Sequence, residues 1–323
     1  MDIVQHSTDK YDQFCLQHAD KIPVFFQPWW LEALAGCGKV EKLIFQTKSG
    51  EVFGIWPVFQ KQKYGFRWNT LPPYTPVSGP WLISAPENAP ALIKSVAARF
   101  PWVLYFLTHS FQGLSFRNAW ESAGFETELR YTYQLPRVKE AEDLYHLFQP
   151  NTRSRIRKAA QLLEVRAEQN LDRFLPLYIR HAKERNIFTN QHLSAFKALF
   201  EAGLTQNQGA LWCAYDRQDT LVAGIFAVWD QQQMYILVTS MDRDFREYQA
   251  PRLLLWHAIQ QAVKQGLAFD FEGGNVPGIG SFFASFGATK TPYLRAMRYG
   301  NKIWRRVVKR AELLKNSVPP SAT

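Results

Sequence analysis

Two carboxylates, Asp270 and Glu272, stand two residues apart in the short apolar segment 268–272, which is typical of a β-strand. In a strand they would face one side of the sheet, and the two phenylalanines beside them would face the other. Like charges this close disfavour ionisation and raise at least one pKa. Either residue is therefore a candidate catalytic base for an ammonium nucleophile, or an acceptor that positions it. In the alternative, one of them caps the following Gly273-Gly274 turn or pairs with an arginine.

A second group of charged residues opens a predicted helix over Asn151–Leu163. Arg153 and Arg157 are four residues apart and share a helix face as like charges, and Lys158 follows directly. Cations near a helix N-terminus also oppose the helix dipole. This unfavourable placement indicates a polyanionic partner for these three residues. The alternative is a solvated face without a partner.

The chain has 323 residues, 38 Lys+Arg, 28 Asp+Glu and a hydrophobic fraction of 46%. These values exclude a disordered chain, a coiled coil and a collagen-like repeat. No apolar run reaches the roughly 18 residues of a membrane-spanning helix, and the N-terminus lacks the apolar centre of a signal peptide. Three widely spaced cysteines predict no disulfide partner, and no cysteine or histidine spacing predicts a metal site. We therefore expect a cytoplasmic protein.

The order of the predicted elements occurs twice. In each half, helices precede antiparallel strands, which are followed by a helix, a strand, a helix and a strand. Domains usually contain about 100–200 residues, so the length also favours two domains. We expect an N-terminal domain over residues 1–136, a C-terminal domain over residues 137–300 and a basic tail over residues 301–323.

The basic excess is concentrated at the C-terminus, where residues 290–323 contain nine basic residues and one acidic residue. Residues 301–316 fit an amphipathic helix, with Trp304 on the apolar face and cations on the rest. Such a helix is typical of peripheral contact with an anionic membrane, here its inner face. It equally fits a helix that packs on the second domain and presents its cations to tRNA. A tail that only solubilises the protein is a third interpretation.

Four segments carry a family resemblance. They are Phe26–Leu31, Asn151–Ala159, Phe269–Gly274 and Phe282–Ala288. With the repeated element order, they resemble the FemAB-like branch of the GNAT N-acetyltransferase superfamily, over nearly the whole chain. The resemblance implies an α/β (α+β) fold with two tandem GNAT-like domains, each a mixed, mostly antiparallel sheet flanked by helices. The C-terminal domain would hold the donor site.

The resemblance also implies where an acyl donor would bind. In the GNAT fold, the strand before the long helix supplies backbone N–H groups that polarise the donor carbonyl. By position these donors belong to Leu237, Val238 and Thr239. The next loop and the start of the long helix would then bind the donor phosphates.

The phosphate loop departs from the GNAT pattern Gln/Arg-x-x-Gly-x-Gly/Ala. The nearest match starts at Arg246, with Gln249 in the place of the first glycine and Pro251 in the place of the second small residue. FemAB-like proteins also lack a good form of this pattern, so the departure favours that branch. Arg246, Gln249 and Arg252 are the expected donor-binding residues, and a solvated arginine-rich turn is the alternative.

Two further residues take roles from the resemblance. Asn275 would either cap the next helix or bond the donor's pantetheine. Tyr293 would protonate the leaving group, or would be an ordinary core tyrosine.

FemAB-like proteins transfer amino acids from aminoacyl-tRNA to peptidoglycan precursors, and other members resemble acyl-CoA-dependent N-acyltransferases that act on sugars. We therefore predict an acyltransferase that forms an amide bond, with aminoacyl-tRNA or acyl-CoA as donor and no metal. The acceptor would be a small molecule or a glycan or peptide precursor of the cell wall or of a polysaccharide. Two alternatives remain. One is an acyl-CoA-dependent N-acyltransferase for an amino sugar or lipid intermediate, and the other is a non-catalytic binding or scaffold protein.

Overall fold

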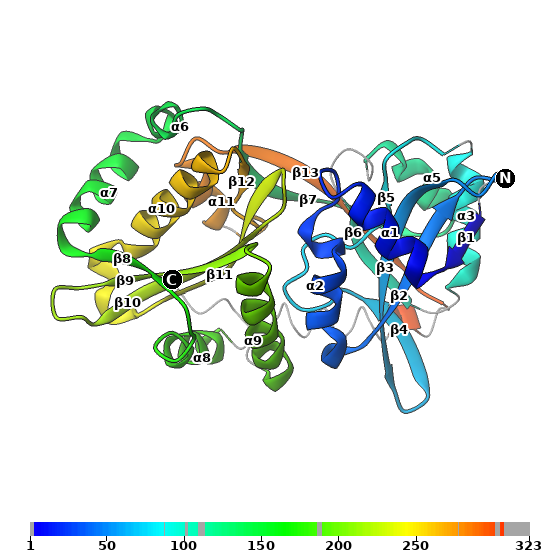
Figure 1. Ribbon diagram of the computed structural model, residues 1–323, viewed down its shortest axis with the longest axis horizontal. Coiled ribbons are helices and arrows are strands. Elements are labelled where there is room, and N and C mark those ends of the chain that lie inside the picture. Colours follow the sequence, from blue (N-terminus) through cyan, green and yellow to red (C-terminus); the bar gives the residue numbers. More distant parts are fainter. Residues whose placement is uncertain are drawn as a thin grey trace. The chain divides into compact units, whose positions relative to one another are not determined.

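The structure is a computed structural model that describes residues 3–86, 88–100, 103–108, 114–185, 189–276, 278–300 and 304–306. Its internal contacts divide the chain into two units. Unit 1 comprises Met1–Arg130 and Pro292–Thr323, and unit 2 comprises Tyr131–Thr291. In each unit, helices lie against a β-sheet (Figure 1).

In unit 1, one strand and two helices come before most of the other strands, and further helices follow. The strands are β1 (Ile3–His6), β2 (Lys39–Gln46), β3 (Val52–Lys63), β4 (Phe66–Thr70), β5 (Trp81–Leu82) and β6 (Val103–Thr108). The helices are α1 (Thr8–Gln17), α2 (Pro28–Ala33), α3 (Ala89–Arg99) and α5 (Arg117–Ser122), with 3-10 turns at Val24–Phe26 and Ala35–Cys37. The strand order is β1-β2-β3-β4-β6, with β5 on β3, and only β4 and β6 are parallel in this set.

Unit 2 follows a similar plan. Its strands are β8 (Glu164–Glu168), β9 (Gly209–Tyr215), β10 (Leu221–Trp229), β11 (Gln233–Met241) and β12 (Ala268–Asp270). Its helices are α6 (Ala141–Leu147), α7 (Pro150–Leu162), α8 (Leu175–Glu184), α9 (Asn190–Thr205), α10 (Ala250–Lys264) and α11 (Ile279–Ala284), with a 3-10 turn at Arg243–Tyr248. The strand order is β8-β9-β10-β11-β12, and only β11 and β12 are parallel in this set.

The next strand of each sheet comes from the other half of the sequence. β7 (Glu126–Leu135) follows the helices of unit 1, yet its end pairs antiparallel with β12 of unit 2. β13 (Thr289–Arg298) follows the helices of unit 2, yet its second half pairs antiparallel with β6 of unit 1. The division therefore differs from the expected boundary after residue 136. It falls at Arg130, and the residues from Pro292 onwards, expected in the C-terminal domain and the tail, join unit 1.

Each unit has a separate apolar core. In unit 1, the ring of Trp56 packs edge-on against the ring of Phe106, with centroids 5.0 Å apart, beneath α3. In unit 2, α10 covers one face of the sheet and α8 and α9 cover the other (Figure 1). Successive residues of β10 serve the two faces, since Ile225 joins the α10 core and Phe226 packs on Phe196 of α9. This alternation explains why β10 is a continuous apolar run.

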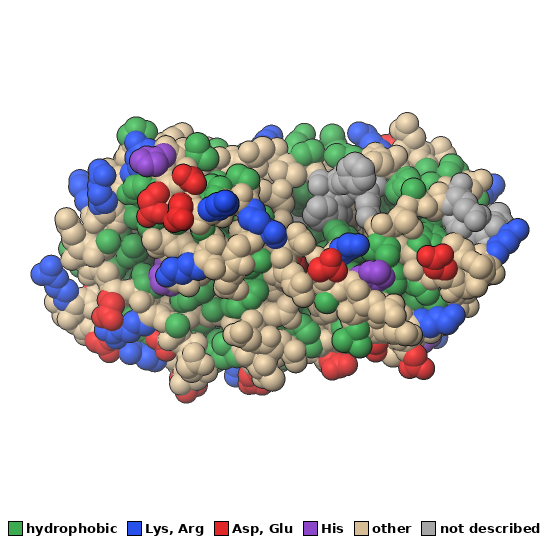
Figure 2. All heavy atoms as spheres, turned by 45° about the horizontal axis from the view of Figure 1, so that its top comes forward, with side chains coloured by type: hydrophobic (Ala, Val, Ile, Leu, Met, Phe, Trp, Pro, Cys, Tyr) green, Lys and Arg blue, Asp and Glu red, His purple; other side chains and the backbone are tan. Residues whose placement is uncertain are grey.

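Charged side chains of both signs are visible on one face of the molecule (Figure 2). On the face drawn in Figure 2, basic and acidic side chains lie close to one another rather than in large groups of one sign. Among the helices that the structure describes, none has the length and apolar character needed to cross a membrane.

The expected amphipathic helix over residues 301–316 lies outside the described residues except at Trp304–Arg306, which are helical. There, the ring of Trp304 lies 5.2 Å from the ring of Phe66, and Arg305 pairs with Glu126 at 2.7 Å. These contacts place this turn on unit 1. The interpretation in which Trp304 packs on the second domain is therefore wrong at these residues.

Candidate functional site

The strands β11 and β12 run together for three residues and then diverge. Their parallel pairing covers Gln233–Tyr235 and Ala268–Asp270, whereas β11 continues to Met241. After Asp270 the chain turns away through three left-handed residues, with φ angles of 51° at Glu272, 93° at Gly273 and 118° at Gly274. Beyond Tyr235, β11 thus has no ladder partner on its β12 side among the described residues.

Gly274 is required by both its backbone and its surroundings. A Cβ atom at this position would lie 2.6 Å from the ring of Tyr133, closer than carbon atoms can approach. The Gly-Gly pair that follows the two carboxylates therefore has a structural origin, because it lets the chain leave the sheet beside β7.

A β-bulge falls on the diverging part of β11. Val238 pairs with Phe226 and Ile236 pairs with Ala227, so Leu237 has no residue opposite it on β10. A bulge leaves backbone groups outside the ladder and redirects the strand. The bulge begins the segment Leu237, Val238 and Thr239 for which we predicted N–H donors. The backbone of this segment is thus in a position to donate to a carbonyl oxygen.

Asp270 ends β12 and is only 3% exposed. Its Oδ1 accepts from the Thr132 hydroxyl and from the Glu272 backbone N–H at 2.9 Å. Its Oδ2 accepts from the side-chain amides of Gln134 at 2.8 Å and Gln233 at 2.9 Å. Burial raises the pKa of Asp270, although the four donors oppose that change. A carboxylate with four donors is a structural acceptor, which favours the positioning role over the role of base.

Glu272 has a different environment. The side chain is partly buried, and its carboxylate has no hydrogen bond or ion pair within the described ranges. Burial raises the pKa of Glu272 well above its usual range, and the nearby charge of Asp270 raises it further. Glu272 is therefore the better candidate base. The predicted shared strand face is wrong, because β12 ends at Asp270 and Glu272 is left-handed.

Arginines gather at the start of α10. Arg252 stacks on the ring of Phe282, 4.5 Å from its centroid, and its buried Nε and Nη1 atoms have no hydrogen-bond partner in the described part of the chain. Burial lowers the pKa of Arg252, and the charge of Arg155 lowers it further. Arg155 donates to the side-chain oxygen of Gln249 at 3.4 Å. Two guanidinium groups without an acid between them form a site that suits an anion.

The residue in place of the GNAT glycine keeps a glycine-like backbone. Gln249 has φ 56° and ψ 28°, in the left-handed region. This conformation costs a non-glycine residue about 1–2 kcal/mol. The loop therefore takes the shape that a glycine would allow, but its side chain and the missing N–H of Pro251 leave fewer backbone donors.

The other cations predicted to bind a donor or a polyanion lie in different environments. Arg246 is exposed, with no ion-pair partner for its guanidinium among the described residues. Arg153 donates to the backbone oxygens of His146 at 3.1 Å and Phe148 at 2.7 Å, so it fixes the end of α6. Arg157 and Lys158 are exposed on α7. Of the three cations predicted to bind a polyanion, only these two present free side chains.

The structure also shows where Asn275 and Tyr293 lie. Asn275 accepts from the Tyr131 backbone N–H at 2.9 Å and donates to the Tyr131 oxygen at 3.0 Å. It thus fastens the loop after β12 to β7, and the residue at the N-terminus of α11 is Gly278, so the predicted helix cap is wrong. Tyr293 lies on the part of β13 that belongs to unit 1, whereas Asp270 and Glu272 belong to unit 2.

Two residues near the site escaped prediction. Arg155 was one of several cations on its helix, and no spacing distinguishes it from Arg153. His181 of α8 has its Nδ1 atom 3.3 Å from the Ser240 hydroxyl on the diverging part of β11, and burial lowers its pKa. A neutral imidazole at this position is a second candidate base. A single histidine in a helix carries no sequence signal for this role. Within the described ranges, no cluster of acidic, histidine or cysteine side chains suits a metal ion.

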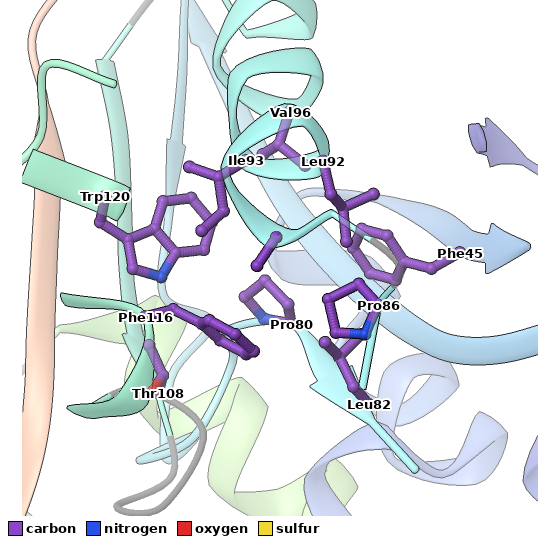
Figure 3. Close-up of a pocket in the computed structure, with 11 residues that line it drawn as sticks. Phe45, Pro80, Leu82, Pro86, Leu92, Ile93, Val96, Thr108, Phe116 and Trp120 are labelled. Atoms are coloured by element: carbon purple, nitrogen blue, oxygen red, sulfur yellow. The ribbon is translucent and has the colours of Figure 1, made fainter. Parts of the chain in front are cut away.

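Unit 1 contains an apolar pocket between α3 and its sheet (Figure 3). Thr108 is the single polar residue of its lining. The apolar residues are Phe45, Pro80, Leu82, Pro86, Ala89, Leu92, Ile93, Val96, Phe116 and Trp120.

Comparisons with known proteins show which class of domain and which fold this chain resembles. Residues 148–277 match the family described as an acetyltransferase (GNAT) domain. The structure of FemX has a TM-score of 0.68 at 13% identity, over 90% of this chain and 96% of that chain. The C-terminal domain of a putative lysylphosphatidylglycerol synthetase from Agrobacterium fabrum has a TM-score of 0.57 at 12% identity, over 97% and 100%. A tandem GNAT protein from the clavulanic acid biosynthesis pathway has a TM-score of 0.52 at 8% identity, over 93% and 98%. No curated protein matches the sequence.

Residues 148–277 thus form a GNAT acetyltransferase domain, the class of domain found in acyltransferases, and nearly the whole chain has the fold of FemX and of a tandem GNAT protein. More particularly, the similarity in fold to FemX agrees with the resemblance of the sequence to the FemAB-like branch of that superfamily. The expected fold class is confirmed as well.

Replacing Glu272 with Gln should stabilise the protein at neutral pH. The folded-state pKa of Glu272 lies above the unfolded value of about 4.3, so wild-type stability falls as the pH rises from that value towards the folded-state pKa. Glu272→Gln removes this loss, and we expect its Tm to exceed the wild-type Tm at pH 7.5 by about 2–4 °C, equivalent to roughly 1 kcal/mol. The two Tm values should converge near pH 4. Glu201→Gln, which changes an exposed residue of α9, is the control and should follow the wild type. A lower Tm for Glu272→Gln at pH 7.5 would show that the carboxylate is stabilising.

Proposed function

We propose that unit 2 binds an acyl donor where β11 and β12 diverge and transfers its acyl group to an amine. The observation that carries this proposal is the bulge at Leu237, on the part of β11 that no longer pairs with β12. The donor carbonyl would lie beside Leu237–Thr239 and accept from their backbone N–H groups. These groups would also stabilise the oxyanion that forms when the amine attacks.

Glu272 would act on the amine before the attack. An ammonium ion cannot attack a carbonyl, so its proton must move to a base first. The Glu272 carboxylate has no hydrogen-bond or ion-pair partner in the described part of the chain, and burial raises its pKa, so it takes up a proton more readily than an ordinary carboxylate. The amine nitrogen then bonds to the carbonyl carbon. The carbon–oxygen bond of an ester or the carbon–sulfur bond of a thioester breaks, and the leaving group takes up the proton that the nitrogen loses as the amide forms. His181 is the alternative base, and Tyr293 remains a predicted proton donor.

The phosphates of the donor would bind at the start of α10. Arg252 offers two unpartnered guanidinium nitrogens, Arg155 adds a second cation, and exposed Arg246 lies in the preceding turn. Both aminoacyl-tRNA and acyl-CoA carry phosphates, so the charges suit either donor. Gln249 and Pro251 leave a binding surface made of side chains rather than of backbone amides. This favours the FemAB-like reaction, in which an aminoacyl group is transferred to an amine of a cell-wall or polysaccharide precursor in the cytoplasm.

A second candidate is an acyl-CoA-dependent transfer to a lipid intermediate. The left-handed backbone of Gln249 retains the loop shape that GNAT enzymes use for CoA. A lysylphosphatidylglycerol synthetase is also among the structural neighbours.

Donor binding distinguishes these candidates. A donor at one hundred times its Kd should stabilise the protein by about 2.7 kcal/mol, which a thermal shift detects. A shift with aminoacyl-tRNA but with no acyl-CoA supports the first candidate, and a shift with acyl-CoA supports the second. No shift with either donor would contradict the proposed donor site and favour a binding or scaffold protein.

Arg252→Gln should weaken donor binding without affecting the chemical step. Loss of a charge-assisted contact of about 1.5–3 kcal/mol should raise the KM for the donor at least tenfold, while kcat stays near the wild-type value. The matched control is Lys197→Gln, which removes an exposed cation from α9 of the same unit. Steady-state kinetics with varied donor measure both constants. An unchanged KM in Arg252→Gln would leave the arginines with a structural role only.

Glu272→Gln should lower kcat by about 10²–10⁴-fold, because the amine then lacks its base. Asp270→Asn keeps the size of a residue that four donors fix, so we expect a smaller loss of kcat and a clear loss of stability. The pH profiles of kcat for the two variants show which of the two carboxylates is the base. If Asp270→Asn abolishes turnover in a well-folded protein while Glu272→Gln retains it, the assigned roles are reversed.

A further inference from the structure

The β3–β4 hairpin of unit 1 ends in exposed aromatic side chains. Its two-residue turn, Tyr64-Gly65, has φ angles of 51° and 79°, and Lys63 pairs with Phe66 on either side of it. Tyr64 is 85% exposed and Phe66 is 54% exposed. In Figure 1 the hairpin projects beyond the body of unit 1. Large apolar groups concentrated at a projecting tip mark an interaction surface.

Trp304 extends this aromatic group. Its ring stands nearly perpendicular to the ring of Phe66, at 74°, with centroids 5.2 Å apart. Tyr64, Phe66 and Trp304, which we call the aromatic tip, thus bring residues 240 positions apart together at one end of unit 1. Tyrosine and tryptophan are enriched where proteins meet the bilayer headgroups, since each side chain has an apolar body and a polar atom.

A basic hollow lies on the other side of the same hairpin. Alternation along β4 directs Arg67 away from the face of Phe66. The hollow is lined by His6, Lys39, Glu41, Gln60, Arg67, Arg99 and Phe100.

The charges of the basic hollow are unbalanced. Arg99 pairs with Glu41, the one acid in the lining. Lys39 and Arg67 have no acidic partner among the residues that the structure describes. The hollow therefore carries a surplus of positive charge and would attract phosphate groups.

We propose that the aromatic tip and the basic hollow dock unit 1 on an anionic lipid bilayer. Tyr64 and Phe66 would enter the headgroup region, and Lys39 and Arg67 would bind lipid phosphates. A single-stranded nucleic acid needs aromatic and basic side chains within one groove. Here the aromatic rings and the hollow occupy opposite faces of the hairpin, which favours a planar surface met by its tip. This docking is independent of the donor site proposed in unit 2.

Flotation of the full chain with vesicles tests the proposal. Wild-type protein should float with phosphatidylglycerol–phosphatidylcholine vesicles at low salt, much less at high salt, and weakly with phosphatidylcholine alone. Lys39→Gln with Arg67→Gln should lower the partition coefficient roughly thirty-fold, which is about 1 kcal/mol for each cation near an anionic surface. Tyr64→Ser with Phe66→Ser should lower binding to a similar degree and should also reduce the residual binding at high salt.

Matched variants control for charge and apolar surface elsewhere in unit 1. Lys48→Gln removes an exposed cation from the β2–β3 turn, and Leu16→Ser removes an apolar side chain of α1 that is 80% exposed. Both should float like the wild type, and all variants should melt like it. Absence of wild-type flotation, or equal flotation of the wild type and both hairpin variants, overturns the proposal. A loss of tRNA retention in Lys39→Gln with Arg67→Gln, with flotation unchanged, assigns the hollow to RNA and overturns it as well.

Discussion

The buried carboxylate of Asp270 is the constraint on which the architecture of unit 2 depends. It accepts hydrogen bonds from β7 through Thr132 and Gln134, from β11 through Gln233, and from the chain that leaves β12. A buried charge is tolerated only when such donors surround it. Asp270 therefore requires β7 beside β12, although β7 follows the helices of unit 1 in the sequence.

The same constraint creates the reactive part of the site. Thr132, Gln134 and Gln233 all donate to Asp270, and no donor in the described part of the chain bonds to the Glu272 carboxylate, which is left partly buried and unpaired. The left-handed turn at Glu272 leads the chain away from the ladder between β11 and β12, and the bulge at Leu237 lies beyond the end of that ladder, where β11 pairs with β10 but not with β12. The Asp270 carboxylate, which has four hydrogen-bond donors, thus fixes the positions of the unpaired Glu272 carboxylate and of the β11 backbone at Leu237–Thr239. Local instability of this kind is expected where the proposed reaction would need a base and an oxyanion donor.

Much of this fold could be predicted from the sequence, because the order of the elements depends on local patterns. The meander of unit 2 and α10 carry clear turn and helix signals, such as the proline at the start of α10. The exchange of β7 and β13 could not be predicted. Both segments are ordinary strands by pattern, and only pairing across the fold decides which sheet each one completes. The bulge at Leu237 and the left-handed Glu272 are likewise set by neighbouring strands rather than by their own residue types.

The candidate site, like the fold, could be predicted from the sequence only in part. Asp270 and Glu272 were identifiable as a carboxylate pair, but their unequal surroundings come from β7 and β11, which are distant in sequence. Arg153 and Arg155 look alike in the sequence. The structure uses Arg153 to fix the end of α6 and places Arg155 beside Arg252. Charge alone therefore indicated an anionic partner on this helix without showing which cation serves the start of α10.

The central claim is that an acyl donor binds along β11 where that strand leaves β12. Amide hydrogen exchange of β11, measured with and without a saturating donor, tests it most directly, because the claim concerns backbone N–H groups. We predict that the amides from Leu237 to Met241 become protected when the donor binds, while those of Gln233–Tyr235, which already face β12, change little. Protection confined to other segments, with no change from Leu237 to Met241, would contradict the account.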